Sequence, residues 1–184
     1  MKTHLALLRG INVSGHKLIK MEELRKLLGS AGFKNVSTYI QSGNVFVDAG
    51  EKSSVTVGEK IKSIIKEKYG WDVGVVVLDL PYLQNTVKDN PFLKEPEIDL
   101  KQVYVAFLSE EPKPENIEKF REFDIQNDVA IIDGKVMYLK YFHGAGNTKL
   151  TNALIESKLK VVATSRNWNT TLKLLGMFLD RNRS

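Results

Sequence analysis

MEELRKLLGSAGFKNVSTYIQSGNVFVDA, residues 21–49, decides the fold because its hydrophobic period changes once along its length. The first part repeats apolar residues at helical spacing, at Met21, Leu24, Leu27, Leu28 and Ala31. Residues 36–41 and 44–48 are two runs typical of strands, joined at Ser42-Gly43 as in a hairpin. This stretch therefore predicts a helix followed by two antiparallel strands.

The segments on either side complete one structural half. Residues 4–9 are typical of a strand that precedes the helix. Ser54 can cap a second helix, and residues 73–78 form a β-branched strand after it. The resulting order, β-α-β-β-α-β, predicts a ferredoxin-like half, in which an antiparallel sheet carries two helices on one face.

The remainder of the chain repeats this order after a break at residues 81–100. That segment holds three of the five prolines and predicts a short helix and a linker. The same pattern of strands and helices follows, with Asp133-Gly134 as the second hairpin turn. We predict an α+β fold, an α/β sandwich of two ferredoxin-like halves with antiparallel sheets, at 1–80 and 101–184, the second with an added C-terminal helix.

Composition excludes several classes of protein. The chain is 42% hydrophobic, which suits a packed core, yet no stretch approaches the roughly 20 apolar residues of a membrane span. There is no cysteine, so no disulfide and no Cys-based metal site can form. His4, His16 and His143 are scattered without metal-ligand spacing. We expect a cytoplasmic protein that holds no metal or cofactor and is not bound to a membrane.

Two nucleotide-related motifs are matched only in part. GINVSGHKL, residues 10–18, has glycines at P-loop spacing, but His16 stands where a P-loop needs lysine. SGNVFVDA, residues 42–49, keeps Gly43, Phe46 and Val47 of the third-strand motif of RNA-recognition modules but has Asn44 and Ala49 in place of aromatic residues. In the second half, Tyr104 and Tyr138 could face outward as stacking platforms for bases, although core packing is the more common use of such rings.

The loop after the first strand is the first candidate site. It carries five polar residues ahead of a helix: Arg9, Asn12, Ser14, His16 and Lys17. Backbone N–H groups at a helix start, together with fixed positive charge, suit a phosphate or a carboxylate. An ordinary strand-to-helix turn explains the same residues, so both interpretations stay open.

TSRNWNT, residues 164–170, is the second candidate site. Ser165 or Asn167 can cap the last helix, and Trp168 begins its buried stripe. A cap needs only one oxygen. Arg166 and Asn169 are therefore left to recognise an oxyanion or a carbonyl group.

Four blocks of the chain resemble a bacterial family known as domain of unknown function 1697. They are LLRGINVSG, KMEELRKLLGSAGFKNVSTYIQSGNVFV, NPF and TSRNWNTTLKLL. The resemblance implies two ferredoxin-like halves and a bacterial cytosolic protein, and it implies no activity. The family usually has glycine where Ser14 stands. Its marked positions fall on polar and glycine-rich turns: Arg9, Gly10, Asn12, Lys17, Gln41, Ser42, Gly43, Asn44, Asn90, Pro91, Phe92, Arg166, Asn167, Trp168 and Asn169.

The sequence favours a binding protein whose ligand is anionic: a nucleotide, a nucleic acid, or a phosphate or carboxylate compound. Residues 134–184 carry nine Lys/Arg against two Asp/Glu, which attracts anions of any kind. The predicted ligand-binding residues are Arg9, Asn12, Lys17, Gln41, Asn44, Arg166 and Asn169. One alternative is a small metal-independent hydrolase or transferase that uses Arg, Asn and His groups, with His16 or His143 as acid or base. Another is a protein–protein interaction module.

Overall fold

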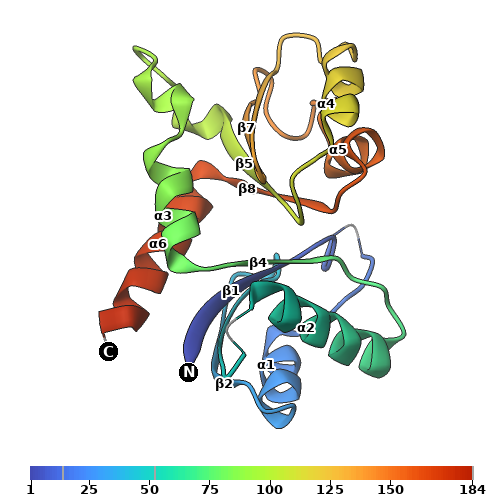
Figure 1. Cartoon of the computed structure of the whole chain (residues 1–184), viewed down its shortest axis with the longest axis vertical. Helices are drawn as coiled ribbons and strands as arrows, with labels where there is room; N and C mark the ends of the chain where they lie inside the picture. Colours follow the sequence, from blue (N-terminus) through green and yellow to red (C-terminus); the bar gives the residue numbers. More distant parts are fainter. Residues whose placement is uncertain (14, 52, 184) are drawn as a thin grey trace. The chain divides into compact units, whose positions relative to one another are not determined.

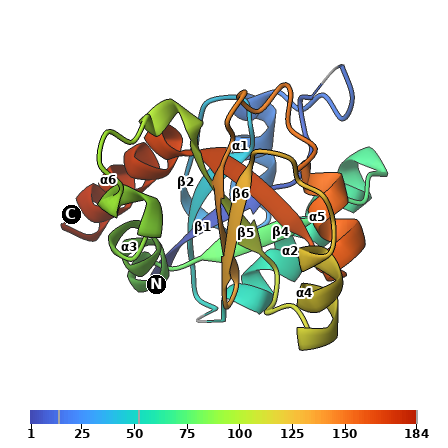
Figure 2. The same ribbon diagram turned by 90° about the horizontal axis from the view of Figure 1, so that it is seen from above.

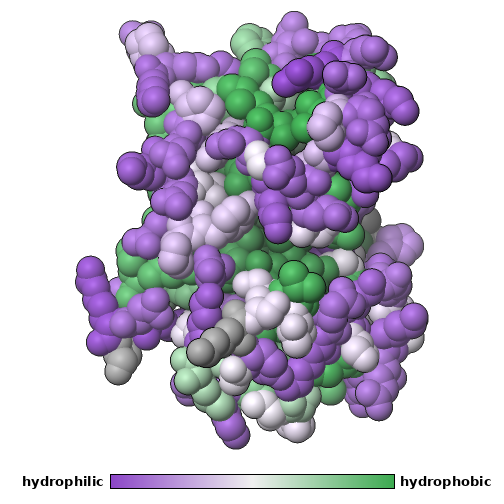
Figure 3. All heavy atoms as spheres, in the orientation of Figure 1, coloured by the Kyte–Doolittle hydropathy of each residue, from purple (hydrophilic) through white to green (hydrophobic). Residues whose placement is uncertain are grey.

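A computed structural model describes residues 1–13, 15–51 and 53–183 of the chain. The chain folds into two compact units, one formed by residues 1–83 with 175–184 and the other by residues 84–174. Hydrophilic side chains dominate the face drawn in Figure 3, as expected for surface exposed to water. The prediction that concerned Ser14 falls outside the described residues.

The first unit contains the β-α-β-β-α-β order that the sequence predicts (Figure 1). Its elements are β1 (Lys2–Leu8), α1 (Met21–Ser30), β2 (Lys34–Tyr39), β3 (Asn44–Ala49), α2 (Ser54–Tyr69) and β4 (Val75–Leu78). The strands form one sheet in the order β2-β3-β1-β4, and every neighbouring pair is antiparallel. The cap of α2 lies one residue earlier than predicted, because the Ser53 side chain accepts a hydrogen bond from Thr56 N.

Helices α1 and α2 cover one face of this sheet because each presents an apolar stripe to it. Leu24 and Leu28 of α1 and Ile61 of α2 are fully buried in the same cluster as Ala6 and Val45 of the strands. Burial of such side chains contributes about 1.5–3 kcal/mol each relative to full exposure. The strand residues of this cluster alternate with residues that point to the opposite face, as a pleated sheet requires.

The opposite face of the first sheet contacts the end of α6 (Trp168–Arg183). The Phe178 ring meets the Phe46 ring edge-on with centroids 5.4 Å apart. Arg181 donates to Asn35 O and Ser37 Oγ and lies 3.7 Å from the Asp48 carboxylate. Residues 175–184, which the sequence pattern groups with the second half, therefore belong to the first unit.

The second unit repeats the order of elements. The chain enters through α3 (Leu80–Lys88) and two 3₁₀ turns, η1 (Pro91–Lys94) and η2 (Leu100–Gln102). The repeat itself consists of β5 (Val103–Leu108), α4 (Pro114–Arg121), β6 (Val129–Asp133), β7 (Val136–Lys140), α5 (Asn152–Leu159) and β8 (Ala163–Asn167). The sheet order is β6-β7-β5-β8, again antiparallel throughout. Helices α4 and α5 lie side by side, as Figure 2 shows, so the predicted α+β fold of two similar halves is confirmed.

His4 makes the first unit sensitive to acid. Its ring is fully buried, its Nε2 lies 3.1 Å from Glu51 O, and its Nδ1 has no partner among the described residues. Burial lowers the pKa of His4 below its ordinary value of 6.5, and nearby Lys2 acts in the same direction. The Glu51 carbonyl and the carboxylates of Asp79 and Asp48 oppose this shift without overcoming it.

We expect the free energy of unfolding to fall as the pH drops below about 6.5, because the unfolded chain then binds a proton that buried His4 does not. Urea unfolding at pH 7.5 and pH 5.5 measures the change. His4→Gln keeps a side-chain N–H donor but does not titrate, so it should lose less stability between the two pH values. An equal loss in both proteins would assign the pH dependence to other groups.

Candidate ligand pocket in the first unit

Asn12 organises the loop between β1 and α1. Its Nδ2 donates to Ile19 O at 3.0 Å and to Gln41 O at 2.8 Å, and its Oδ1 accepts from Ile19 N at 2.8 Å. The residue adopts a left-handed conformation with φ of 53°, which asparagine tolerates better than most residues. The Asn12 side chain thus links the two ends of the loop to each other and links the loop to the turn that precedes β3.

Lys17 fastens the same loop at its other end. It also has a positive φ, 48°, and its Nζ donates to Asp72 O at 2.7 Å. Between Asn12 and Lys17, His16 N donates to Val13 O at 2.9 Å. The Lys17 ammonium group is therefore held by backbone of its own unit, and the side chain does not line the pocket described below.

The QSGN turn, residues 41–44, packs closely beneath this loop. Gly43 O accepts from Leu8 N at 2.8 Å, which places the turn against the end of β1. Asn44 is fully buried, and its Nδ2 donates to Tyr39 O and Ser42 Oγ. In these contacts Asn44 shapes the turn, while Gln41 stays exposed at the surface.

A pocket of about 630 Å³ opens where the loop, the turn and the start of α1 meet. Its lining comes from three separate segments of the first unit: Asn12, Leu18, Ile19, Lys20, Met21, Glu22, Glu23, Arg25 and Gln41. The volume is within the range of small-molecule sites, about 300–1,000 Å³. Two of the predicted ligand-binding residues, Asn12 and Gln41, line it.

Four charged side chains line the pocket, and three of them are in ion pairs. Glu22 binds Lys26 at 2.7 Å, and Glu23 lies 3.7 Å from the Lys20 ammonium group. The hydrogen bond from Lys26 lowers the pKa of the Glu22 carboxyl group. Arg25 instead donates from Nη1 to Thr38 Oγ1 at 2.6 Å, and no carboxylate of the described residues pairs with it.

Arg9 stands where β1 ends. Its backbone N donates to Gly74 O at 2.8 Å, and its side chain is half-buried. It does not line the pocket. A role of Arg9 in ligand binding stays a prediction.

The TSRNWNT segment lies in the second unit and spans the end of β8 and the start of α6. Asn167 Oδ1 accepts from Thr170 N at 2.8 Å, which confirms one of the two predicted caps. Arg166 is only 7% exposed, and its Nη1 donates to Thr164 Oγ1 and Ser165 O. Burial lowers the pKa of Arg166 to about 10. Asn169 is exposed, and binding by these two residues also stays a prediction.

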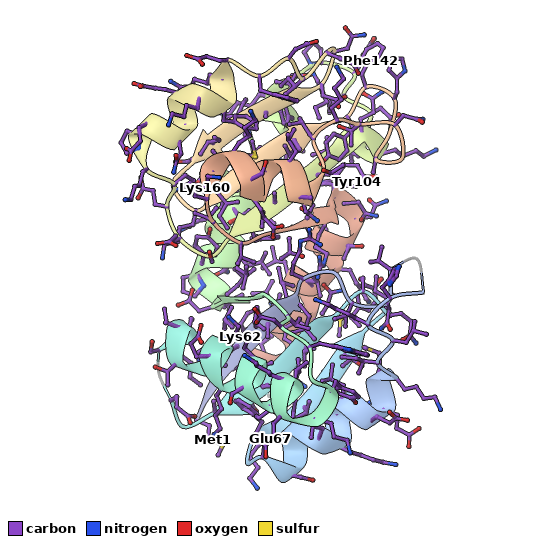
Figure 4. All side chains as sticks on the ribbon, turned by 90° about the vertical axis from the view of Figure 1, so that its right-hand side faces the viewer. Met1, Lys62, Glu67, Tyr104, Phe142 and Lys160 are labelled. Carbon is purple, nitrogen blue, oxygen red and sulfur yellow. The ribbon has the colours of Figure 1, made fainter. Side chains whose placement is uncertain are left out.

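The proposed pair of aromatic platforms is wrong. Tyr104 lies opposite Leu139 in the β5–β7 register, whereas Tyr138 lies opposite Val105, so the two rings point to opposite faces of the sheet. Tyr138 is buried and donates its hydroxyl to Thr86 O at 3.2 Å. Tyr104, labelled in Figure 4, packs against Tyr141, and the centroids of the two rings are 4.6 Å apart. Neither ring is free to stack on a base.

Metal binding and membrane insertion find no support among the described residues. No group of three or more His, Cys, Asp or Glu side chains is placed to hold a metal ion within residues 1–13, 15–51 and 53–183. Over the same part of the chain, no helix combines the length and the apolar character needed to cross a bilayer.

Sequence reasoning missed Lys20, Arg25 and Leu18 as pocket residues. Lys20 directly precedes the amphipathic helix α1 and Arg25 lies within it, and basic residues at such positions usually belong to a solvated face. The signal that could have found them was the position of Arg25 one turn after the start of α1, next to a loop rich in turn formers. Only the fold shows that this face of α1 borders Asn12 and Gln41.

The comparisons with known proteins concern the fold and the family. A search of curated proteins finds no match. The solved structure of a conserved bacterial protein, SP0830 from Streptococcus pneumoniae, is similar with a TM-score of 0.73 and 24% identity, over 96% of this chain and 98% of that one. The sequence profile of a family described as "Protein of unknown function (DUF1697)" matches residues 1–138. The chain therefore belongs to that family.

Proposed function

We propose that the pocket in the first unit binds a small organic anion, with a carboxylate or phosphate group held by Arg25. One observation carries the proposal: Arg25 is the only charged residue of the lining that pairs with no carboxylate among the described residues. A guanidinium group carries five N–H donors in a planar fork that suits such anions. One of its nitrogens is already anchored by Thr38, which fixes the direction of the others.

The surroundings of Arg25 support binding of a single anionic group. The first turn of α1 lines the pocket, and Lys20 at its N-cap makes no side-chain cap, so backbone N–H groups there need other partners. Asn12 fixes the neighbouring loop by three hydrogen bonds. A site already held in place loses less conformational entropy when it binds.

Nucleic acid is less favoured as the ligand. Glu22 and Glu23 also line the pocket, and their carboxylates would repel a chain of phosphates. The second unit offers no pair of outward-facing tyrosines to stack on bases. A single compact anion presents fewer negative charges to these carboxylates than a chain of phosphates does.

Catalysis is also less favoured than binding. The described lining contains no histidine, serine, threonine or tyrosine. The carboxyl groups in this lining are those of Glu22 and Glu23, and the hydrogen bond from Lys26 lowers the pKa of Glu22 below its ordinary value. A carboxyl group that stays ionised is a poor general acid. The interaction-module hypothesis stays a prediction.

Arg25→Gln is expected to weaken the binding of acetate and inorganic phosphate by about 10- to 100-fold, since a hydrogen bond to a charged group contributes about 1.5–3 kcal/mol. Titration followed by backbone amide NMR shifts measures this, with Ile19 and Met21 as reporters. Arg121→Gln is the matched control, because it removes one exposed arginine charge from the second unit. Equal affinities in wild type and Arg25→Gln would reject Arg25 as the anion site.

A further inference from the structure

We infer that the anion bound in the pocket carries an apolar chain, so that the ligand class is an alkyl or aryl carboxylate or phosphate ester. This inference rests on the proposed function and concerns the part of the ligand that is attached to the anionic group. Its starting point is Leu18, which lines the pocket and is nevertheless 64% exposed. So much exposed apolar surface on a leucine that lines a pocket offers a contact to an apolar part of a ligand.

The exposure of Leu18 is built into the fold. The residue before it, Lys17, is fastened to Asp72 O by its ammonium group. The residue after it, Ile19, is buried and held through both its N–H and its C=O by the Asn12 side chain. With both neighbours fixed, the chain between them holds Leu18 at the pocket.

Two further exposed apolar residues are sequence neighbours of pocket residues. Val13 is 57% exposed and directly follows pocket residue Asn12. Ile40 is 50% exposed and directly precedes pocket residue Gln41. In the described part of the first unit, only two other large hydrophobic side chains are exposed, Met1 and Val55.

The backbone at Ile40 strengthens this interpretation. Its φ is 50°, a left-handed conformation that is strained for a β-branched residue. An exposed isoleucine in such a conformation gains nothing from core packing. Strain of this kind is concentrated at binding sites, where the surrounding structure maintains it.

A soluble amphiphile fits this combination better than a lipid in a bilayer. Arg25 meets the anionic group, and Leu18 gives the attached chain an apolar surface within about 630 Å³. The same chemistry occurs in anionic lipids. Glu22 and Glu23, however, lie at the same pocket and would repel a surface covered with anionic headgroups.

The test is a titration series of acetate, butyrate, hexanoate and octanoate against the full chain. Wild type should bind each longer acid more tightly, by about two- to fourfold for each methylene that leaves water. Leu18→Ser should flatten this dependence on chain length, whereas Leu18→Met should retain it. Val55→Ser is the control for an exposed apolar residue outside the pocket.

The two proposals fail in different ways. Arg25→Gln should weaken all four acids by a common factor and keep the dependence on chain length. If wild type binds acetate but gains nothing with chain length, the apolar inference is overturned and the anion site stands. If acetate does not bind, the proposed function fails. Co-sedimentation with phosphatidylglycerol vesicles that Leu18→Ser abolishes would overturn the choice of a soluble ligand.

Discussion

Trp168→Ala is expected to lower the free energy of unfolding by about 3–5 kcal/mol. The indole of Trp168 is 2% exposed and belongs to the largest fully buried side chains of the protein. Alanine removes its whole apolar surface from the interior and leaves a cavity that the surrounding side chains fill only in part. Because the residue directly follows the helix cap at Asn167, its loss also frees the start of α6. Urea unfolding followed by circular dichroism measures the change.

Trp71, the other tryptophan, provides the control for this experiment. It is half-buried and stacks on Tyr69, with the two ring centroids 5.2 Å apart. Trp71→Ala should cost less, on the order of 1–2 kcal/mol, since part of the ring is already in contact with water. If Trp168→Ala were no more damaging than Trp71→Ala, the segment at 164–170 would not be an anchored helix start.

Gly43→Ala is expected to cost about 2–4 kcal/mol, by adding left-handed strain to overpacking. The φ of Gly43 is 76°, and an added Cβ would lie 2.7 Å from Leu8 Cβ and 2.9 Å from Ile11 Cδ1. Both neighbours are buried, so neither can move aside without disturbing the sheet or the pocket loop. Thermal and urea unfolding should both show the loss.

Gly29→Ala is the matched control for Gly43→Ala. Gly29 lies in α1, and a Cβ there would meet nothing within 4 Å. Alanine is a better helix former than glycine by about 0.8–1.0 kcal/mol, so this variant should be at least as stable as wild type. A Gly43→Ala protein of wild-type stability would mean that the QSGN turn has another conformation.

The local pattern predicts the elements and their order because hydrophobic period and turn chemistry are properties of neighbouring residues. The hairpin turns at Gly43 and Gly134 and the helical spacing of Leu24 and Leu28 required no knowledge of tertiary structure. The alternation of side chains between the two faces of a strand is equally local, so Lys140 lies on the same face as Tyr138, two residues before it.

The rest depends on contacts between segments that are distant in sequence. The outward orientation of Tyr104 and Tyr138 needed the register between β5 and β7, which places the two rings on opposite faces. The pocket required the meeting of α1 with two loops, so the sequence singled out Asn12 and Gln41 individually and passed over Arg25. An amphipathic helix such as α6 shows in its sequence that it will cover a sheet, and does not show which one.

The destination of α6 has a consequence for chain topology. The first unit is discontinuous: the chain leaves it after residue 83 and returns at residue 175, so the second unit is an insertion within the first. Contacts such as Arg181 with Asn35 join residues 146 positions apart, and non-local closure of this kind slows folding. During synthesis, Phe178 can cover the sheet around Phe46 only after the whole inserted unit has been made.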